Sequence, residues 1–146
     1  MITEDQILAK VMQASRNIEY FISLYLCKIF SIDYDVSKAF GNRSGALSLN
    51  SKVILLTDIK FLEKSELPKV QVFLEIRNQF AHNREVVNFK TCFFHGKDCE
   101  QKLKKWYAHD LPKDLQDEEE ASLLFDMLYN NLDEILKEMD ETGRRE

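Results

Sequence analysis

Apolar positions recur every three to four residues along most of this 146-residue chain, which is the spacing of one face of an α-helix. Over residues 4–30 this spacing predicts one long amphipathic helix, and Thr3 with Gln6 forms a capping box that would begin it. A second long helix is predicted to begin at Asp117, because acidic residues are favourable at a helix N-terminus. Its expected buried stripe consists of Ala121, Leu124, Leu128, Leu132, Ile135 and Met139.

Shorter helices are predicted between the two long ones. Residues 47–57 are apolar apart from Lys52, and their β-branched content makes a strand the alternative to a helix. Ser65 is expected to cap the next helix, which carries Pro68 in its first turn, where proline is tolerated, and ends near His82.

Residues 85–96 are less regular and rich in β-branched and aromatic side chains, so a short hairpin is an alternative there. Residues 98–107 again have helical spacing. The scarcity of glycine and proline argues against the many turns of an all-β protein. We therefore expect an all-α fold, a single domain over residues 1–146. It would be a bundle of four to five helices with the long first and last helices antiparallel.

Charge is unevenly distributed along the chain, whose net charge is −5. Residues 117–146 carry eleven acidic and three basic side chains, so the rest of the chain is mildly basic. This is not the concentrated basic face that duplex DNA requires, although it leaves room for a local phosphate site. The acidic N-terminus and the lack of a long uncharged apolar run predict a cytoplasmic protein that does not span a membrane.

The three cysteines are an odd number, which implies no disulfide framework and fits a reducing compartment. Cys92, His95 and Cys99, with His109 as a fourth, offer the nitrogen and sulfur ligands that zinc takes. Their spacing matches no common zinc finger, and both cysteines also suit apolar positions. Buried structural thiols are therefore the preferred interpretation, and no metal or other cofactor is expected.

Residues 77–82 (Arg-Asn-Gln-Phe-Ala-His) are the candidate for chemistry. A histidine can take and return a proton near neutral pH, and an arginine can hold a phosphate with two hydrogen bonds. Together they suffice for RNA cleavage without a metal, in which the 2′-hydroxyl attacks the neighbouring phosphate.

The spacing of these residues sets a geometric condition. On a regular helix Arg77 and His82 lie about 140° apart. They meet only if the helix ends or distorts near Ala81, or if two subunits bring two such segments together across a two-fold axis. The alternative is that they form a hydrogen-bonded cap that fastens the following loop.

The Arg-Asn-x-x-x-His string of residues 77–82 resembles the signature of the HEPN superfamily. Residues 47–67, followed by residues 76–82, are also similar to the mannitol operon repressor family, and this likeness covers roughly residues 40–90. The HEPN resemblance implies a helical homodimer with a composite site. In that site Arg77 would bind phosphate, His82 would act as acid or base, and Asn78 would orient His82 or the substrate.

Two functions follow from the resemblances. The HEPN likeness implies an RNA-binding protein and a metal-independent endoribonuclease of toxin or phage-defence type, with an antitoxin or regulator as a protein partner. Arg43, Lys52 and Arg84 are then the candidates for binding the RNA substrate. The mannitol-repressor likeness implies instead a non-catalytic regulator of transcription that acts through protein–protein contacts. The surplus aromatic residues of the first helix fit a dimer or partner surface as well as a broad core face; they are Tyr20, Phe21, Tyr25 and Phe30.

Overall fold

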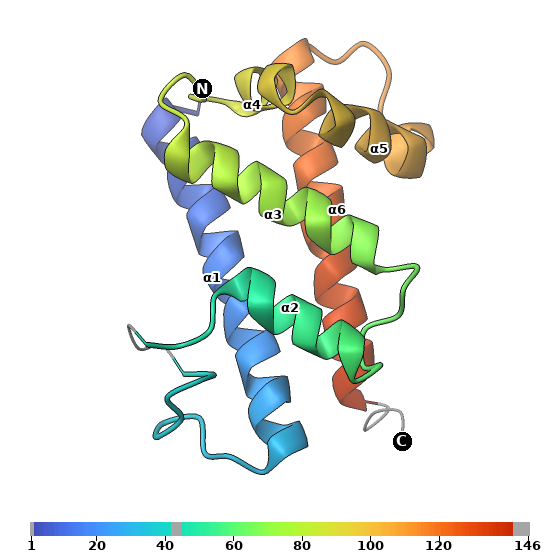
Figure 1. The fold of residues 1–146 in the computed structure, drawn as a ribbon. Helices are drawn as coiled ribbons and strands as arrows, with labels where there is room; N and C mark the ends of the chain where they lie inside the picture. Colours follow the sequence, from blue (N-terminus) through green and yellow to red (C-terminus); the bar gives the residue numbers. More distant parts are fainter. Residues whose placement is uncertain (1, 42–44, 142–146) are drawn as a thin grey trace.

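The computed structural model describes residues 2–41 and 45–141, apart from the side chains of residues 97, 140 and 141. Over these residues the chain forms six α-helices and one 3-10 helix, and no strand (Figure 1). The elements are α1 (Glu4–Phe30), α2 (Leu49–Asp58), α3 (Leu67–His82), α4 (Phe89–His95), α5 (Lys97–Tyr107), the 3-10 helix η1 (Ala108–Asp110) and α6 (Asp117–Glu141).

The two long helices α1 and α6 lie side by side and run in the same direction (Figure 1). Three contacts in register establish the direction. Lys10 pairs with Asp126 at 2.6 Å, Asn17 donates to the Tyr129 hydroxyl at 3.0 Å, and farther along α1 the Tyr25 hydroxyl donates to a carbonyl of α6 at 2.5 Å. The prediction of antiparallel helices was therefore wrong, because an amphipathic stripe shows which side of a helix is buried but not its direction.

Helices α2 and α3 cross the pair formed by α1 and α6, and α4 and α5 lie against α3 and the first part of α6 (Figure 1). The centre of the core is aromatic. Phe73 of α3 stacks on Phe125 of α6 with ring centroids 5.9 Å apart, and Phe89 of α4 lies 5.0 Å from Phe125. Burial of such large apolar rings is the main source of stability in a domain of this size, and it fixes α3 across the long helices.

Several local predictions are confirmed. The capping box of Thr3 and Gln6 begins α1, and all six residues of the predicted α6 stripe are buried. Residues 49–58 are helical rather than extended, and Pro68 lies in the first turn of α3. No helix within the described residues is long and apolar enough to cross a lipid bilayer.

Two local predictions are wrong. Residues 89–95 form the helix α4 rather than part of a hairpin, which raises the number of α-helices above four to five. A capping box of Asn88 and Thr91 begins this helix. The helix α3 begins after Glu66 and has no side-chain cap, so Ser65 does not cap it.

Candidate functional site

The last two turns of α3 carry Arg77, Asn78 and His82. The helix runs without interruption from Leu67 to His82, and Asn83 closes it with a backbone hydrogen bond to Gln79. The side chains of Arg77 and His82 therefore keep the angular separation of about 140° that a regular helix imposes. The distortion near the end of α3 that would bring them together in one chain does not occur.

Arg77 is half-buried and points into a cleft of about 500 Å³ between α1, α2 and α3. Glu19, Asn50 and Asn78 also line this cleft. One terminal guanidinium nitrogen of Arg77 donates to the side-chain oxygen Oδ1 of Asn78 at 3.2 Å, whereas its Nε is buried without a hydrogen-bond partner among the described residues. A buried donor without a partner is unfavourable, and it is the terminal nitrogens of the guanidinium, not Nε, that can bind a ligand in the cleft.

His82 is exposed at the end of α3, and it is not among the residues that line the Arg77 cleft. Within residues 2–41 and 45–141 its side chain makes no hydrogen bond or ion pair. Arg84 is exposed in the following turn. Arg43 lies outside the described residues.

The turn after α3 is fastened by other side chains. Asn83 donates to the Gln79 side chain at 3.0 Å and accepts from the backbone N–H of Glu85 at 3.0 Å. Gln79 in turn donates to Glu75 at 2.9 Å. The loop-fastening role considered for Arg77 and His82 therefore falls to their neighbours on the same helix.

Lys52 has a different environment from the one expected of a surface charge. Its side chain is only 2 % exposed and lies between α2 and α1. The ammonium group donates to the Ser23 hydroxyl at 2.9 Å and to Glu19 Oε2 at 3.2 Å. An ammonium this deeply buried needs such partners, because an unpaired buried charge is strongly unfavourable.

Lys52 also lines a hollow of about 270 Å³ that opens beside α1. Arg16, Tyr20 and Tyr34 share this hollow with it. Glu19 lines both this hollow and the Arg77 cleft, so the two depressions meet at its carboxylate. Sequence reasoning did not single out Glu19, because nothing in the pattern of α1 indicates which residue of a later helix it will pair with.

The cysteine and histidine residues considered as zinc ligands are not assembled. Cys92 and Cys99 are buried, and burial raises their pKa to about 12 and about 11, so both thiols are protonated near neutral pH. His95 Nε2 lies 3.7 Å from Glu85, and His109 lies beside Asp110 on η1. No group of three or more histidine, cysteine or acidic side chains that could hold a metal ion occurs within the described residues.

The chain is thus an all-helical domain with a polar cleft across α1, α2 and α3. At the end of α3 it exposes His82, whose side chain makes no hydrogen bond or ion pair with the described residues. Comparison of the chain with protein-family models, with curated proteins and with solved structures finds no match.

Proposed function

We propose that this chain is an HEPN-like, RNA-binding protein of the cytoplasm, and that two copies assemble a metal-independent endoribonuclease site of toxin or phage-defence type. The observation that supports the proposal is the availability of its two key groups. Asn83 and Gln79 hold the turn after α3, so among the described residues the imidazole of His82 has no partner and the Arg77 guanidinium bonds only to its neighbour Asn78.

In each site the reaction would need one proton-transfer group and one positive charge beside the phosphate. One imidazole takes the proton of the 2′-hydroxyl, and the 2′-oxygen forms a bond to phosphorus. The bond from phosphorus to the 5′-oxygen breaks, that leaving oxygen takes a proton from water, and the imidazolium returns its proton to the solvent. Arg77 stabilises the negative charge that grows on the phosphate oxygens. The products are a 2′,3′-cyclic phosphate and a 5′-hydroxyl end.

The angular separation of Arg77 and His82 is the reason that the proposal requires two copies. Within one chain Arg77 faces the cleft, and His82 lies outside it. A two-fold axis beside the end of α3 would place His82 of one copy opposite Arg77 of the other. Each site would then be composite.

The first test is cleavage of a generic single-stranded RNA in EDTA by the wild type and by two variants, Arg77→Ala and His82→Ala. We expect each variant to lose at least about 100-fold in rate, since each removes a group that acts in the transition state. Thermal unfolding should change little, because neither side chain fastens the fold. Lys64→Ala is the control, because it removes an exposed positive charge that has no ion pair within the described part of the chain.

Mixing the two inactive variants tests the composite site directly. A dimer of one Arg77→Ala chain and one His82→Ala chain keeps one intact arginine–histidine pair. Equal amounts of the two should therefore recover about a quarter of the wild-type rate, since half of the dimers are mixed and each has one of two sites. Undiminished cleavage by His82→Ala, or no cleavage by a dimeric wild type, would overturn the proposal.

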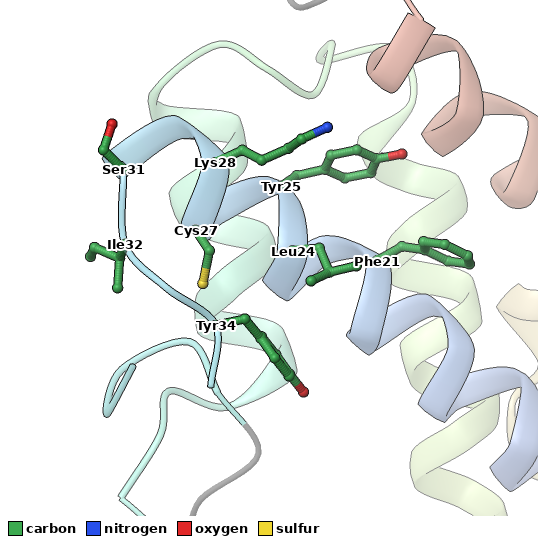
Figure 2. A pocket seen from close by; sticks show the side chains of 8 residues that line it. All are labelled: Phe21, Leu24, Tyr25, Cys27, Lys28, Ser31, Ile32 and Tyr34. Carbon is green, nitrogen blue, oxygen red and sulfur yellow. The ribbon is translucent and has the colours of Figure 1, made fainter. Parts of the chain in front are cut away.

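A second candidate function, a non-catalytic regulator that acts through protein contacts, is favoured by an apolar hollow at the other end of α1. Side chains from the last turns of α1 and from the segment after it line this hollow, among them Phe21, Leu24 and Ile32 (Figure 2). Ile32, which lines the hollow, is 40 % exposed, and Phe30 in the last turn of α1 is 45 % exposed. Exposed apolar groups gathered in this way are typical of protein-binding surfaces. Absence of RNA binding by the wild type would favour this candidate.

A further inference from the structure

The hollow beside Lys52 is formed by three segments of the chain. It is lined on one side by residues of α1, on another by the segment that follows α1, and at its floor by Lys52 of α2. Its volume of about 270 Å³ is large enough for a purine ring and too small for a folded peptide. It adjoins the Arg77 cleft at Glu19.

The floor of the hollow offers a hydrogen-bond donor and an acceptor side by side. An ammonium group has three N–H donors, and Ser23 and Glu19 use two of those of Lys52. Glu19 accepts from Lys52 through Oε2, whereas its Oε1 makes no hydrogen bond with any described residue. The Glu19 side chain is 38 % exposed, so a ligand can reach this carboxylate.

A contribution to the free energy of folding does not explain why Lys52 is buried. A buried ion pair with one half-exposed carboxylate usually contributes no more to folding than an apolar side chain of the same size. A charged group that lines a hollow is, by contrast, a frequent feature of small-molecule binding sites.

The rim of the hollow supplies aromatic rings and a positive charge. Tyr20 is 48 % exposed and meets Tyr34 edge to face, with ring centroids 5.5 Å apart. Neither tyrosine hydroxyl has a hydrogen bond within the described part of the chain. Arg16 is exposed at the rim and forms no ion pair with the described residues. Aromatic rings stack on nucleobases, and an arginine at the edge of such a stack binds phosphate.

We propose that this hollow binds a guanine base. Guanine is the nucleobase that presents two adjacent N–H donors, at N1 and N2, beside an acceptor, O6. The Glu19 carboxylate would accept from the two donors, and the third N–H of Lys52 would donate to O6. The ring would stack on Tyr20, and Arg16 would hold the 5′-phosphate. Adenine, cytosine and uracil each leave one of these protein groups without a partner.

The guanine has two sources, a free nucleotide or a base in an RNA strand. For the RNA strand, the inference rests on the RNA-binding function proposed above. The base would then be held on one side of Glu19 and the strand would continue toward Arg77 on the other side. The protein would in that case prefer RNA with guanine near the cleaved bond.

The first experiment is calorimetric titration of the full chain with GMP, AMP, CMP, UMP and inorganic phosphate. We expect GMP to bind about tenfold more tightly than the other three nucleotides, which is the discrimination typical of one bidentate pair. Equal affinity for GMP and AMP would overturn the inference, as would binding of phosphate as tight as that of GMP.

Variants of Glu19 and Tyr20, each with a control, assign the binding to this hollow. Glu19→Gln keeps the size of the side chain but replaces one acceptor oxygen by a donor, so it should abolish the preference for GMP over AMP. Glu4→Gln is the matched control, because Glu4 is exposed at the start of α1. Tyr20→Ala should weaken the binding of all four nucleotides, whereas Tyr20→Phe should not, because it keeps the aromatic ring. Because Tyr20 is exposed, this pair decides the question even if Glu19→Gln fails to fold. Unchanged binding by Tyr20→Ala would place the ligand elsewhere.

Oligonucleotides separate this inference from the proposed function. An uridine oligomer with one guanosine is compared with the same oligomer without it, in both binding and cleavage. If RNA is bound and cleaved regardless of guanosine, the guanine hollow is refuted and the ribonuclease proposal stands. If GMP binds as expected but no RNA does, the hollow is a free-nucleotide site and the ribonuclease proposal falls.

Discussion

At the scale of single residues, Lys52 has the most unusual environment, because its charged side chain is only 2 % exposed. Leu49, Lys52, Val53 and Leu56 are the buried residues of α2, and they have the spacing of one helix face. The burial of Lys52 could therefore have been predicted from its position on an apolar stripe. Its partners could not, because Glu19 and Ser23 are about 30 positions earlier and only the crossing of α1 and α2 brings them near.

Two substitutions of Lys52 distinguish what its packing and its charge each contribute to the free energy of unfolding. Lys52→Ala should lower the free energy of unfolding by about 2–4 kcal/mol, since it leaves a cavity and an unpaired carboxylate. Lys52→Met fills the same space and should stay within about 1.5 kcal/mol of the wild type, because Glu19 remains half-exposed to water. Urea denaturation measures both. If methionine proved as destabilising as alanine, the ammonium group would be needed for folding, and its proposed role in the hollow would lose support.

For Arg77 and His82, the sequence predicts the relative orientation of the two side chains but not whether they fasten the following turn. Their angular separation follows from helix geometry alone, and the structure agrees because α3 stays regular to its end. Which residues fasten the following turn could not be predicted, because Asn83, Gln79 and Arg77 all have side chains capable of doing so. The choice depends on the direction of the chain after the helix.

At the scale of elements, α4 was the helix hardest to predict. It has seven residues, and four of them have β-branched or aromatic side chains that also suit a strand: Phe89, Thr91, Phe93 and Phe94. Part of its stabilisation comes from far along the chain. The Glu118 carboxylate of α6 accepts from the backbone N–H groups of Phe89 at 3.0 Å and Lys90 at 2.8 Å. These are helix N-terminal donors that no residue within α4 can satisfy.

Loss of this carboxylate should affect α4 first. Glu118→Ala should lower the free energy of unfolding by about 1–2 kcal/mol, the usual range for a helix cap, and Glu118→Gln by less because one acceptor remains. Amide hydrogen exchange should accelerate at residues 89–92. Glu134→Ala, an exposed position on the same helix, is the control. Equal effects of the alanine substitutions at 118 and 134 would show that Glu118 does not cap α4.

At the scale of the whole molecule, the buried thiols make stability depend on alkaline pH. Burial holds the pKa of Cys92 near 12 and that of Cys99 near 11, above the ordinary value of 9.0. Between about pH 9 and pH 11 the unfolded chain releases thiol protons that the folded chain retains. Higher pH therefore favours the unfolded chain, and the free energy of unfolding falls.

This dependence can be measured as the urea midpoint at several pH values. We expect a constant thiol contribution below pH 9 and a decline above it that is smaller in the double variant Cys92→Ala, Cys99→Ala. Tyr107, whose pKa burial raises to about 12, acts in the same direction and remains in the double variant. Identical slopes for the wild type and the double variant would show that the thiols do not contribute.

The parallel course of α1 and α6 has a consequence for biosynthesis. Their side-chain contacts join positions 111 to 116 residues apart, so α1 leaves the ribosome long before the helix that covers it. A nascent chain halted before residue 117 would present an uncovered side of α1 to the solvent. Such a chain would be bound by a chaperone, and its release into the folded state would coincide with emergence of α6.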